Sequence, residues 1–192
     1  MLKAGLLALA LSALGAGAQA APLFDAYQGF CLKTDADAAA GLSAATAAGW
    51  TPIPAAMMQQ LSGAAGVENA DGRMRSNAGG FDFMLVGVKT IPVAGLSLAV
   101  HFCALATTSA PATPNEASTA LAGFAAMPPN PLMSKGGQTG YVYLDEGGVH
   151  KPITTPGDVA SAKAMVQSGR LRFAFVQEGP TLSLLAYAVP SL

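Results

Sequence analysis

Two cysteines, Cys31 and Cys103, are the side chains of this sequence best suited to a defined covalent chemistry. No C-x-x-C motif occurs, and the chain has only two histidines, so a redox or zinc site has little support. In an oxidising compartment a pair of such thiols forms a structural disulfide. The sequence therefore predicts a Cys31–Cys103 bridge, with two free buried thiols as the alternative.

His101 is the candidate general base. It lies in an alternating segment, 96–105, in which Leu96, Leu98, Val100 and Phe102 share one face while His101 and Cys103 share the other. Neither a G-x-S-x-G nor an S-x-x-K motif accompanies it. We expect a buried or half-buried strand histidine, and a catalytic role only if the fold assembles a site around it. The second histidine, His150, is expected to face solvent from a short edge strand.

Trp50 and two arginine pairs are the remaining candidates for ligand contact. Trp50 follows Gly49 and precedes Pro52, a position typical of a core anchor between two helices, with a ligand platform as the alternative. Arg73 and Arg75 have strand spacing, which places both on one face, where they could hold an anion. The pair Arg170 and Arg172 has the same spacing. Solvated strand faces are the plainer interpretation of both pairs.

Metal and cofactor signals are weak. Asp35 and Asp37 resemble the start of a calcium loop, but the glycine and the distal glutamate of that loop are missing. We expect these two acids to stabilise a helix N-terminus instead. The glycine pairs lack both the P-loop lysine and the G-x-G-x-x-G spacing. The sequence therefore predicts neither a metal nor a cofactor.

The charge of the chain also limits its partners. Charged residues make up 11% of the sequence and the formal net charge is −1, which does not suit nucleic-acid binding. Such a weakly charged surface is compatible with self-association or with an envelope protein partner. No identity for such a partner follows from the sequence.

The first twenty residues have the pattern of a secretory signal peptide. Lys3 supplies a positive start, residues 4–14 form an apolar run, and Ala18 and Ala20 are the small residues that signal peptidase requires. We expect cleavage between Ala20 and Ala21, which leaves one domain of 192 − 20 = 172 residues, 21–192, without a transmembrane segment. The periplasm is the expected location, with secretion from the cell as the alternative.

The residue patterns predict helices and hairpins in alternation. Helices are expected from Thr34 or Asp35 to about Ala48, and near 54–61, 114–127 and 156–168. Segment 63–80 is expected to be a loop, with a short strand within it as the alternative. Strands are expected near 81–89, 96–105, 140–144, 149–153, 170–176 and 181–189.

Paired strands between helices are typical of the α+β class, so we expect an antiparallel sheet of about six strands with the helices packed on one face. Because no catalytic signature is assembled, the sequence favours a non-enzymatic exported domain that binds a ligand or a partner. A periplasmic hydrolase around His101 is the alternative.

Overall fold

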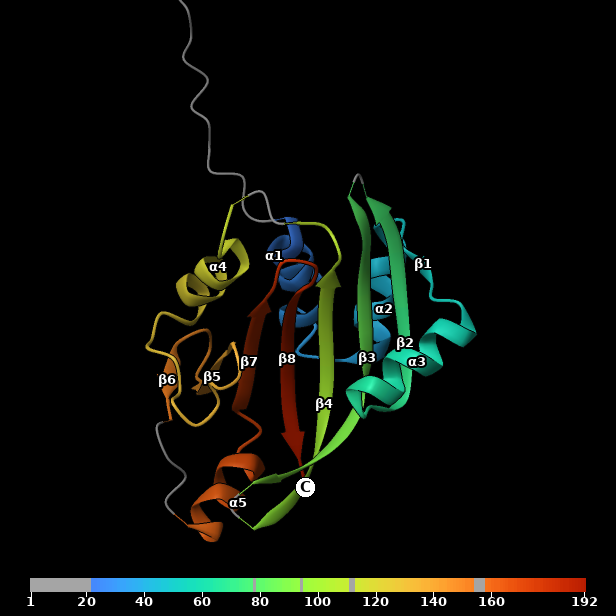
Figure 1. Cartoon of the computed structure of the whole chain (residues 1–192). Helices are drawn as coiled ribbons and strands as arrows, with labels where there is room; N and C mark the ends of the chain where they lie inside the picture. Colours follow the sequence, from blue (N-terminus) through green and yellow to red (C-terminus); the bar gives the residue numbers. More distant parts are fainter. Residues whose placement is uncertain (1–21, 78, 94, 111–112, 154–157) are drawn as a thin grey trace, which may run out of the picture.

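A computed structural model describes residues 22–77, 79–93, 95–110, 113–153 and 158–192 (Figure 1). The predicted signal peptide, 1–20, and its cleavage point at Ala20 and Ala21 lie outside the described residues. The elements are α1 (Pro22–Tyr27), the π-helical turn η1 (Gln28–Leu32), α2 (Ala38–Ala47), β1 (Thr51–Pro52), α3 (Ala55–Ala65), β2 (Glu68–Asn77), β3 (Gly80–Val93), β4 (Leu96–Thr107), α4 (Glu116–Ala125), β5 (Gln138–Asp145), β6 (His150–Pro152), α5 (Val159–Gln167), β7 (Leu171–Glu178) and β8 (Ser183–Ser191).

The strands form one antiparallel sheet in the order β1-β2-β3-β4-β8-β7-β5-β6. The chain is therefore an α+β protein, as predicted, but with eight strands instead of about six. The two additional strands lie at the β1 edge. The two-residue β1 is too short for a periodic pattern. The ten-residue β2 occupies the polar, glycine-rich segment that was expected to be a loop with at most a short strand.

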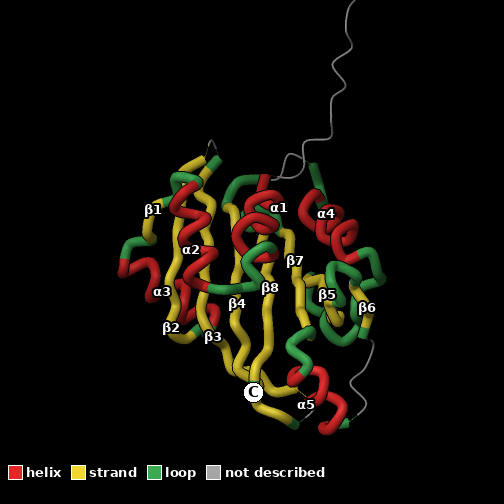
Figure 2. The backbone as a smooth tube through the Cα atoms, turned by 180° about the vertical axis from the view of Figure 1, so that it is seen from behind, coloured by secondary structure: helices red, strands yellow, loops and turns green. Residues whose placement is uncertain are grey.

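The two faces of the sheet are covered differently, and we name them by their contacts. The disulfide face carries Cys103 and Val176, and the helical elements α1, η1, α2 and α4 pack on it (Figure 2). The α5 face carries Leu98 and Phe173, which pack against Val166 of α5.

Helix α3 also lies on the α5 face, at the β2 edge (Figure 1). A Cβ on Gly72 of β2 would come within 2.8 Å of the Met58 side chain of α3. The neighbouring Arg73 points the other way and donates to Thr46 of α2. The prediction that all helices pack on one face is therefore wrong, because the sheet presents apolar side chains on both faces.

The predicted disulfide is confirmed. Cys31 of η1 and Cys103 of β4 are bonded, with their Cα atoms 5.5 Å apart and 72 residues apart in sequence. Both residues are fully buried. The bond fixes the amino-terminal helical segment to the centre of the disulfide face.

A polar contact fixes the same segment a few residues further on. Arg172 of β7 donates from Nε and Nη2 to the Asp35 carboxylate at 2.7 and 2.6 Å, and the Tyr187 hydroxyl donates to Asp35 at 2.8 Å. The expectation of a solvated arginine pair is wrong for Arg172, which is 7% exposed. Asp35 is a partner of this arginine, whereas Asp37 accepts from the amide of Ala40 at the start of α2, as expected of an acid at a helix N-terminus. The predicted helix start at Thr34 or Asp35 is wrong, because both residues belong to the turn before α2.

None of the helices among the described residues is long and apolar enough to cross a membrane.

Candidate functional site

Trp50 is a core residue. It is 2% exposed, and its ring meets Phe30 edge-on with the centroids 5.4 Å apart. The guanidinium carbon of Arg75 lies 4.9 Å from the centre of the indole. Trp50 therefore anchors the helical layer. Its indole is shielded from solvent, and the charged group that it contacts is the guanidinium of Arg75.

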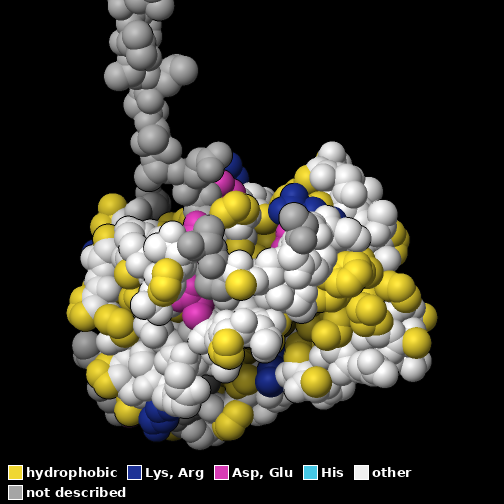
Figure 3. All heavy atoms as spheres, turned by 45° about the horizontal axis from the view of Figure 1, so that its top comes forward, with side chains coloured by type: hydrophobic (Ala, Val, Ile, Leu, Met, Phe, Trp, Pro, Cys, Tyr) yellow, Lys and Arg dark blue, Asp and Glu magenta, His cyan; other side chains and the backbone are white. Residues whose placement is uncertain are grey.

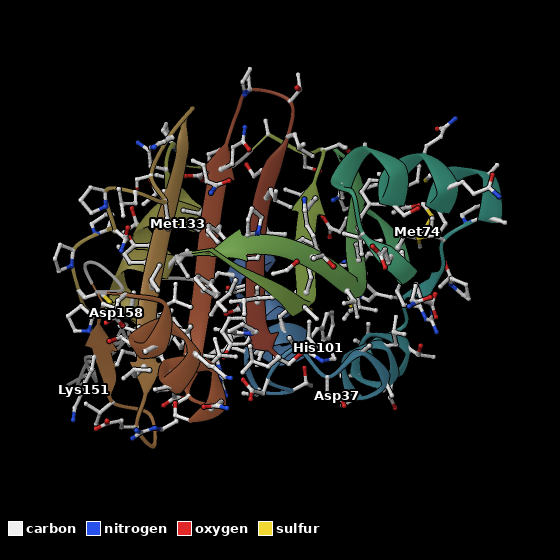
Figure 4. All side chains as sticks on the ribbon, turned by 90° about the horizontal axis from the view of Figure 1, so that it is seen from below. Asp37, Met74, His101, Met133, Lys151 and Asp158 are labelled. Atoms are coloured by element: carbon white, nitrogen blue, oxygen red, sulfur yellow. A yellow bond between two sulfur atoms is a disulfide. The ribbon has the colours of Figure 1, made fainter. Side chains whose placement is uncertain are left out.

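His101 lies on the disulfide face of β4 but is exposed. Figure 4 places it on the same side of the sheet as Asp37, away from Met74 and Met133. Its side chain makes no hydrogen bond or ion pair with the described residues, and it lines neither of the two cavities discussed below. The expectation of a buried or half-buried histidine is wrong, because the helical segment packed over Cys103 leaves His101 uncovered.

His150 also differs from expectation. It lies on the edge strand β6, as predicted, but it is half-buried rather than facing solvent. Its ring packs on Tyr143 and Phe124, with centroid distances of 4.4 and 4.7 Å.

Arg73 and Arg75 share one face of β2, as their spacing predicts, but they bind different partners. Arg73 pairs with Asp71 at 3.0 Å. Arg75 donates from Nε to the Asp82 carboxylate at 2.8 Å. Because a carboxylate already balances each guanidinium, the two arginines do not form a joint anion site.

Arg75 instead begins a polar row that crosses five strands. Direct cross-strand pairs place Arg75 opposite Asp82, Asp82 opposite Thr107, Thr107 opposite Ser183, and Ser183 opposite Glu178. All five residues project from the disulfide face, in line with its apolar side chains. We call this set the polar row.

Hydrogen bonds order one half of the polar row. Asn77 donates to the second oxygen of Asp82 at 2.7 Å and makes a longer contact, 3.5 Å, with the hydroxyl of Thr107. Ser109 donates its hydroxyl to Asn77 and its amide to Thr107. Asp82 is 7% exposed and is thus a buried carboxylate with two well-placed donors.

The other half of the polar row ends at a helix N-terminus. Glu178 accepts from the backbone amides of Ala117 and Ser118 at 3.0 and 3.2 Å. The residue before α4, Asn115, provides no side-chain cap. A carboxylate from β7 therefore satisfies the first amides of α4, where a negative charge is favoured.

Ser183, the member of the row between Thr107 and Glu178, has a side chain without a hydrogen-bond partner among the described residues. The residue is 2% exposed, and its Oγ makes no hydrogen bond within the described part of the chain. A buried hydroxyl without a partner costs about 1–3 kcal/mol. The oxygen has almost no accessible surface, so a ligand atom in a neighbouring cavity can form the missing hydrogen bond only if the wall moves slightly.

A cavity of about 540 Å³ lies over the polar row, at the end of the sheet where the β2–β3 and β7–β8 hairpins turn. All five members of the row line it, together with Glu116, Asn77, Ser109 and the start of α1. Its lining has one arginine and three acids (Asp82, Glu116 and Glu178), a formal charge of 1 − 3 = −2. Figure 3 shows acidic side chains gathered at this end of the molecule.

Within the described residues, no three His, Cys, Asp or Glu side chains converge in a way that could hold a metal ion. Sequence reasoning identified Arg75 but missed Asp82, Thr107, Ser183 and Glu178. A search of protein-family models, curated proteins and solved structures found no match for this chain.

Proposed function

We propose that this chain is an exported, non-enzymatic binding domain that takes a small ammonium-bearing molecule into the cavity over the polar row. The observation that carries the proposal is the buried, unpartnered hydroxyl of Ser183 at the wall of a negatively charged cavity. The predicted signal peptide and the Cys31–Cys103 disulfide support export, with the periplasm as the expected compartment.

The charge of the ligand follows from the charges that remain unbalanced. Asp82 is balanced by Arg75, whereas Glu178 has helix amides and a hydroxyl as its hydrogen-bond partners and Glu116 lies at the first turn of the same helix. Two carboxylates thus face the cavity without a cationic partner, because the one arginine of the lining, Arg75, is paired with Asp82. A positively charged ligand complements this surface, whereas an anion would be repelled.

The hydrogen-bonding capacity of the row also favours a ligand rich in donors. An ionised carboxylate has about four acceptor sites, and Asp82 uses two of them while Glu178 uses three. Ser183 can accept or donate. An ammonium group has up to three donors and fits these vacancies.

The hydrolase alternative has less support in the geometry. His101 is six residues along β4 from Thr107, which is roughly 20 Å at the rise of a strand. No hydrogen bond of His101 to a hydroxyl or a carboxylate occurs among the described residues. A base at this position could not reach a substrate in the cavity over the polar row.

A titration with putrescine, compared with its neutral analogue 1,4-butanediol, tests the proposal. Trp50 is the only tryptophan and is in contact with Arg75, so its fluorescence reports changes at the row. We expect putrescine to bind and butanediol to bind at least tenfold more weakly, with putrescine affinity falling as salt rises. Equal binding of the two compounds, or of neither, would refute an ammonium site.

Ser183→Ala separates binding from folding. Removing a hydroxyl that has no partner should leave the free protein as stable or slightly more stable, while putrescine affinity falls several-fold. Ser191→Ala is the matched control on β8, because the Ser191 hydroxyl donates to Ala99 at 3.3 Å. The control should lose about 0.5–1.5 kcal/mol of stability and keep its affinity. A Ser183→Ala protein with unchanged affinity would contradict the proposed role of this hydroxyl.

A further inference from the structure

A second cavity, of about 390 Å³, lies on the opposite face of the sheet from the polar row. It is enclosed by α5, by the sheet near the β3–β4 hairpin and by segment 130–133. Twelve of its thirteen lining residues are apolar, and the exception is Asn130. Figure 4 shows Met133, one of these lining residues, on the side of the sheet where α3 lies.

The single polar residue of this cavity is already satisfied. Asn130 donates from its amide nitrogen to the carbonyl of Ile153 at 2.8 Å, and its amide oxygen accepts from the Leu132 backbone at 3.0 Å. Water in a cavity needs two to four polar partners, and an apolar cavity of about 150 Å³ stays dry and takes up small hydrocarbons. The side chains that line this larger cavity have few hydrogen-bonding groups free to bind water, so an apolar occupant is favoured.

The wall of the cavity is held in place. The amide of Asn130 donates to the carbonyl of Gly140 on β5 at 2.7 Å, and the amide of Gly140 donates to Ser134. A Cβ on Gly140 would lie 2.7 Å from the Cβ of Met133, so the segment packs against the strand as closely as a glycine allows. Segment 130–133, which forms one side of the cavity, is therefore held against β5.

The lining chemistry indicates the class of ligand. Phe173 is the only aromatic residue in the wall, and the other apolar members are aliphatic or thioether side chains. Met133 and Met165 are unbranched and adapt to the shape of an occupant. A volume of 390 Å³ equals that of about a dozen liquid waters, which leaves room for an alkyl chain of roughly ten carbons.

We infer that this cavity is a second binding site, which takes the alkyl chain of a fatty acid or a similar lipid with the polar head group left in solvent. The site is independent of the polar row, because the two cavities share no lining residue and lie on opposite faces of the sheet.

A chain-length series on the oxidised protein tests this inference. Hexanoate, octanoate, decanoate and dodecanoate are titrated by calorimetry below their micelle concentrations. Each added methylene should tighten binding about fourfold while it enters the cavity, because burying one CH₂ contributes about 0.8 kcal/mol. The gain should stop near ten carbons, where the volume is filled. Absence of binding, or a gain that continues unchanged through dodecanoate, would overturn the inference.

Two variants locate the site. Ala162 is buried in the wall, and Ala162→Phe fills the cavity, with the exposed Ala164→Phe on the same helix as its control. Leu132 is 58% exposed and lines the cavity, so Leu132→Glu places a charge there without disturbing the core. Its control is Leu182→Glu, at a similarly exposed leucine in the β7–β8 turn.

Decanoate affinity should fall at least tenfold in both cavity variants and stay unchanged in both controls. Equal affinities in Leu132→Glu and Leu182→Glu would assign decanoate to the general surface. Sedimentation of the free protein gives an independent check. A dimer that dissociates in Leu132→Glu would show that a second copy occupies this face, and would also overturn the inference.

Discussion

Asp35→Ala removes the acceptor of a buried guanidinium, and its effect on stability can be estimated from the structure. Asp35 lies in the turn between η1 and α2 and accepts three hydrogen bonds, two from Arg172 and one from Tyr187. The Arg172 side chain is 9% exposed. In the alanine variant this cation keeps only its bonds to the carbonyls of Gly169 and Leu171.

The expected loss is about 3 kcal/mol. Breaking a buried ion pair costs about 3–5 kcal/mol, because the remaining charge is left without its partner. The Asp35 side chain is 52% exposed, so water can reach part of the vacated space, and the lower end of the range applies. A domain of this size is stable by about 5–15 kcal/mol, so the loss is a substantial fraction of the total.

Urea unfolding with the disulfide intact, followed by Trp50 fluorescence, measures the loss. With a slope of about 2 kcal/mol per M, the midpoint should fall by roughly 1.5 M. Asp35→Asn should lose less, because asparagine tolerates the left-handed backbone at this position, φ 52°, and keeps one acceptor.

Asp37→Ala, which removes the cap of α2 two residues away, is the control and should cost about 1 kcal/mol. A loss in Asp35→Ala no larger than that of this control would refute the reasoning. So would a double-mutant cycle with Arg172→Met that shows no coupling.

Three further predictions concern stability. Cys31→Ser combined with Cys103→Ser should lose about 4 kcal/mol in urea unfolding, since the bond closes a loop spanning 72 positions. Burial raises the pKa of Tyr187 well above its ordinary value of 10, so the neutral phenol is favoured in the folded state. The stabilisation that the neutral Tyr187 gives the folded state should be complete below about pH 10 and decline as the pH rises above 10. Melting temperatures measured from pH 8 to 11.5 should therefore fall less steeply in Tyr187→Phe than in the unchanged protein. Gly72→Ala should destabilise the protein by more than 1 kcal/mol in thermal melts, because the new Cβ would lie 2.4 Å from the carbonyl oxygen of Met84.

The sequence predicted most of the β-hairpins and the disulfide because local signals encode them. Segment 96–105 places large apolar residues at alternate positions, segment 81–89 contains the apolar run 83–86, and the two segments lie within β4 and β3. Gly49 follows α2 with a positive φ of 84°, as expected of a glycine that ends a helix. The full length of β2 was missed because its ten residues contain one large apolar side chain, Met74, and alternate weakly.

The start of α4 was harder to predict because a distant residue supplies its cap. Thr113 and Glu116 have the spacing of a capping box, which favours a local cap, but α4 follows Asn115 and takes its carboxylate from Glu178 on β7. The predicted start of the last helix near Thr155 falls partly outside the described residues. Within them, α5 is capped by Asp158, which accepts from Ser161 at 2.7 Å.

The polar row has a sequence signature that becomes meaningful only with the strand order. Asp82 is in phase with the buried Met84, Thr107 with Leu105, and Ser183 with Leu185, so each is a polar residue at an inward position of its strand. One inward polar residue at the end of a strand is commonplace, because strands often end where burial ends.

Five strands that bring such residues to one register form a site, and the register depends on β8 entering between β4 and β7. No local pattern encodes that insertion, because Thr107 and Ser183 belong to hairpins separated by two helices and another strand pair. If the polar row were only the edge of the hydrophobic core, its hydroxyls would form hydrogen bonds with water or with each other. Ser183 is instead buried and unpartnered, which is unfavourable unless a ligand supplies the missing bond. The stability of Ser183→Ala with and without putrescine therefore distinguishes a binding site from an imperfectly satisfied core.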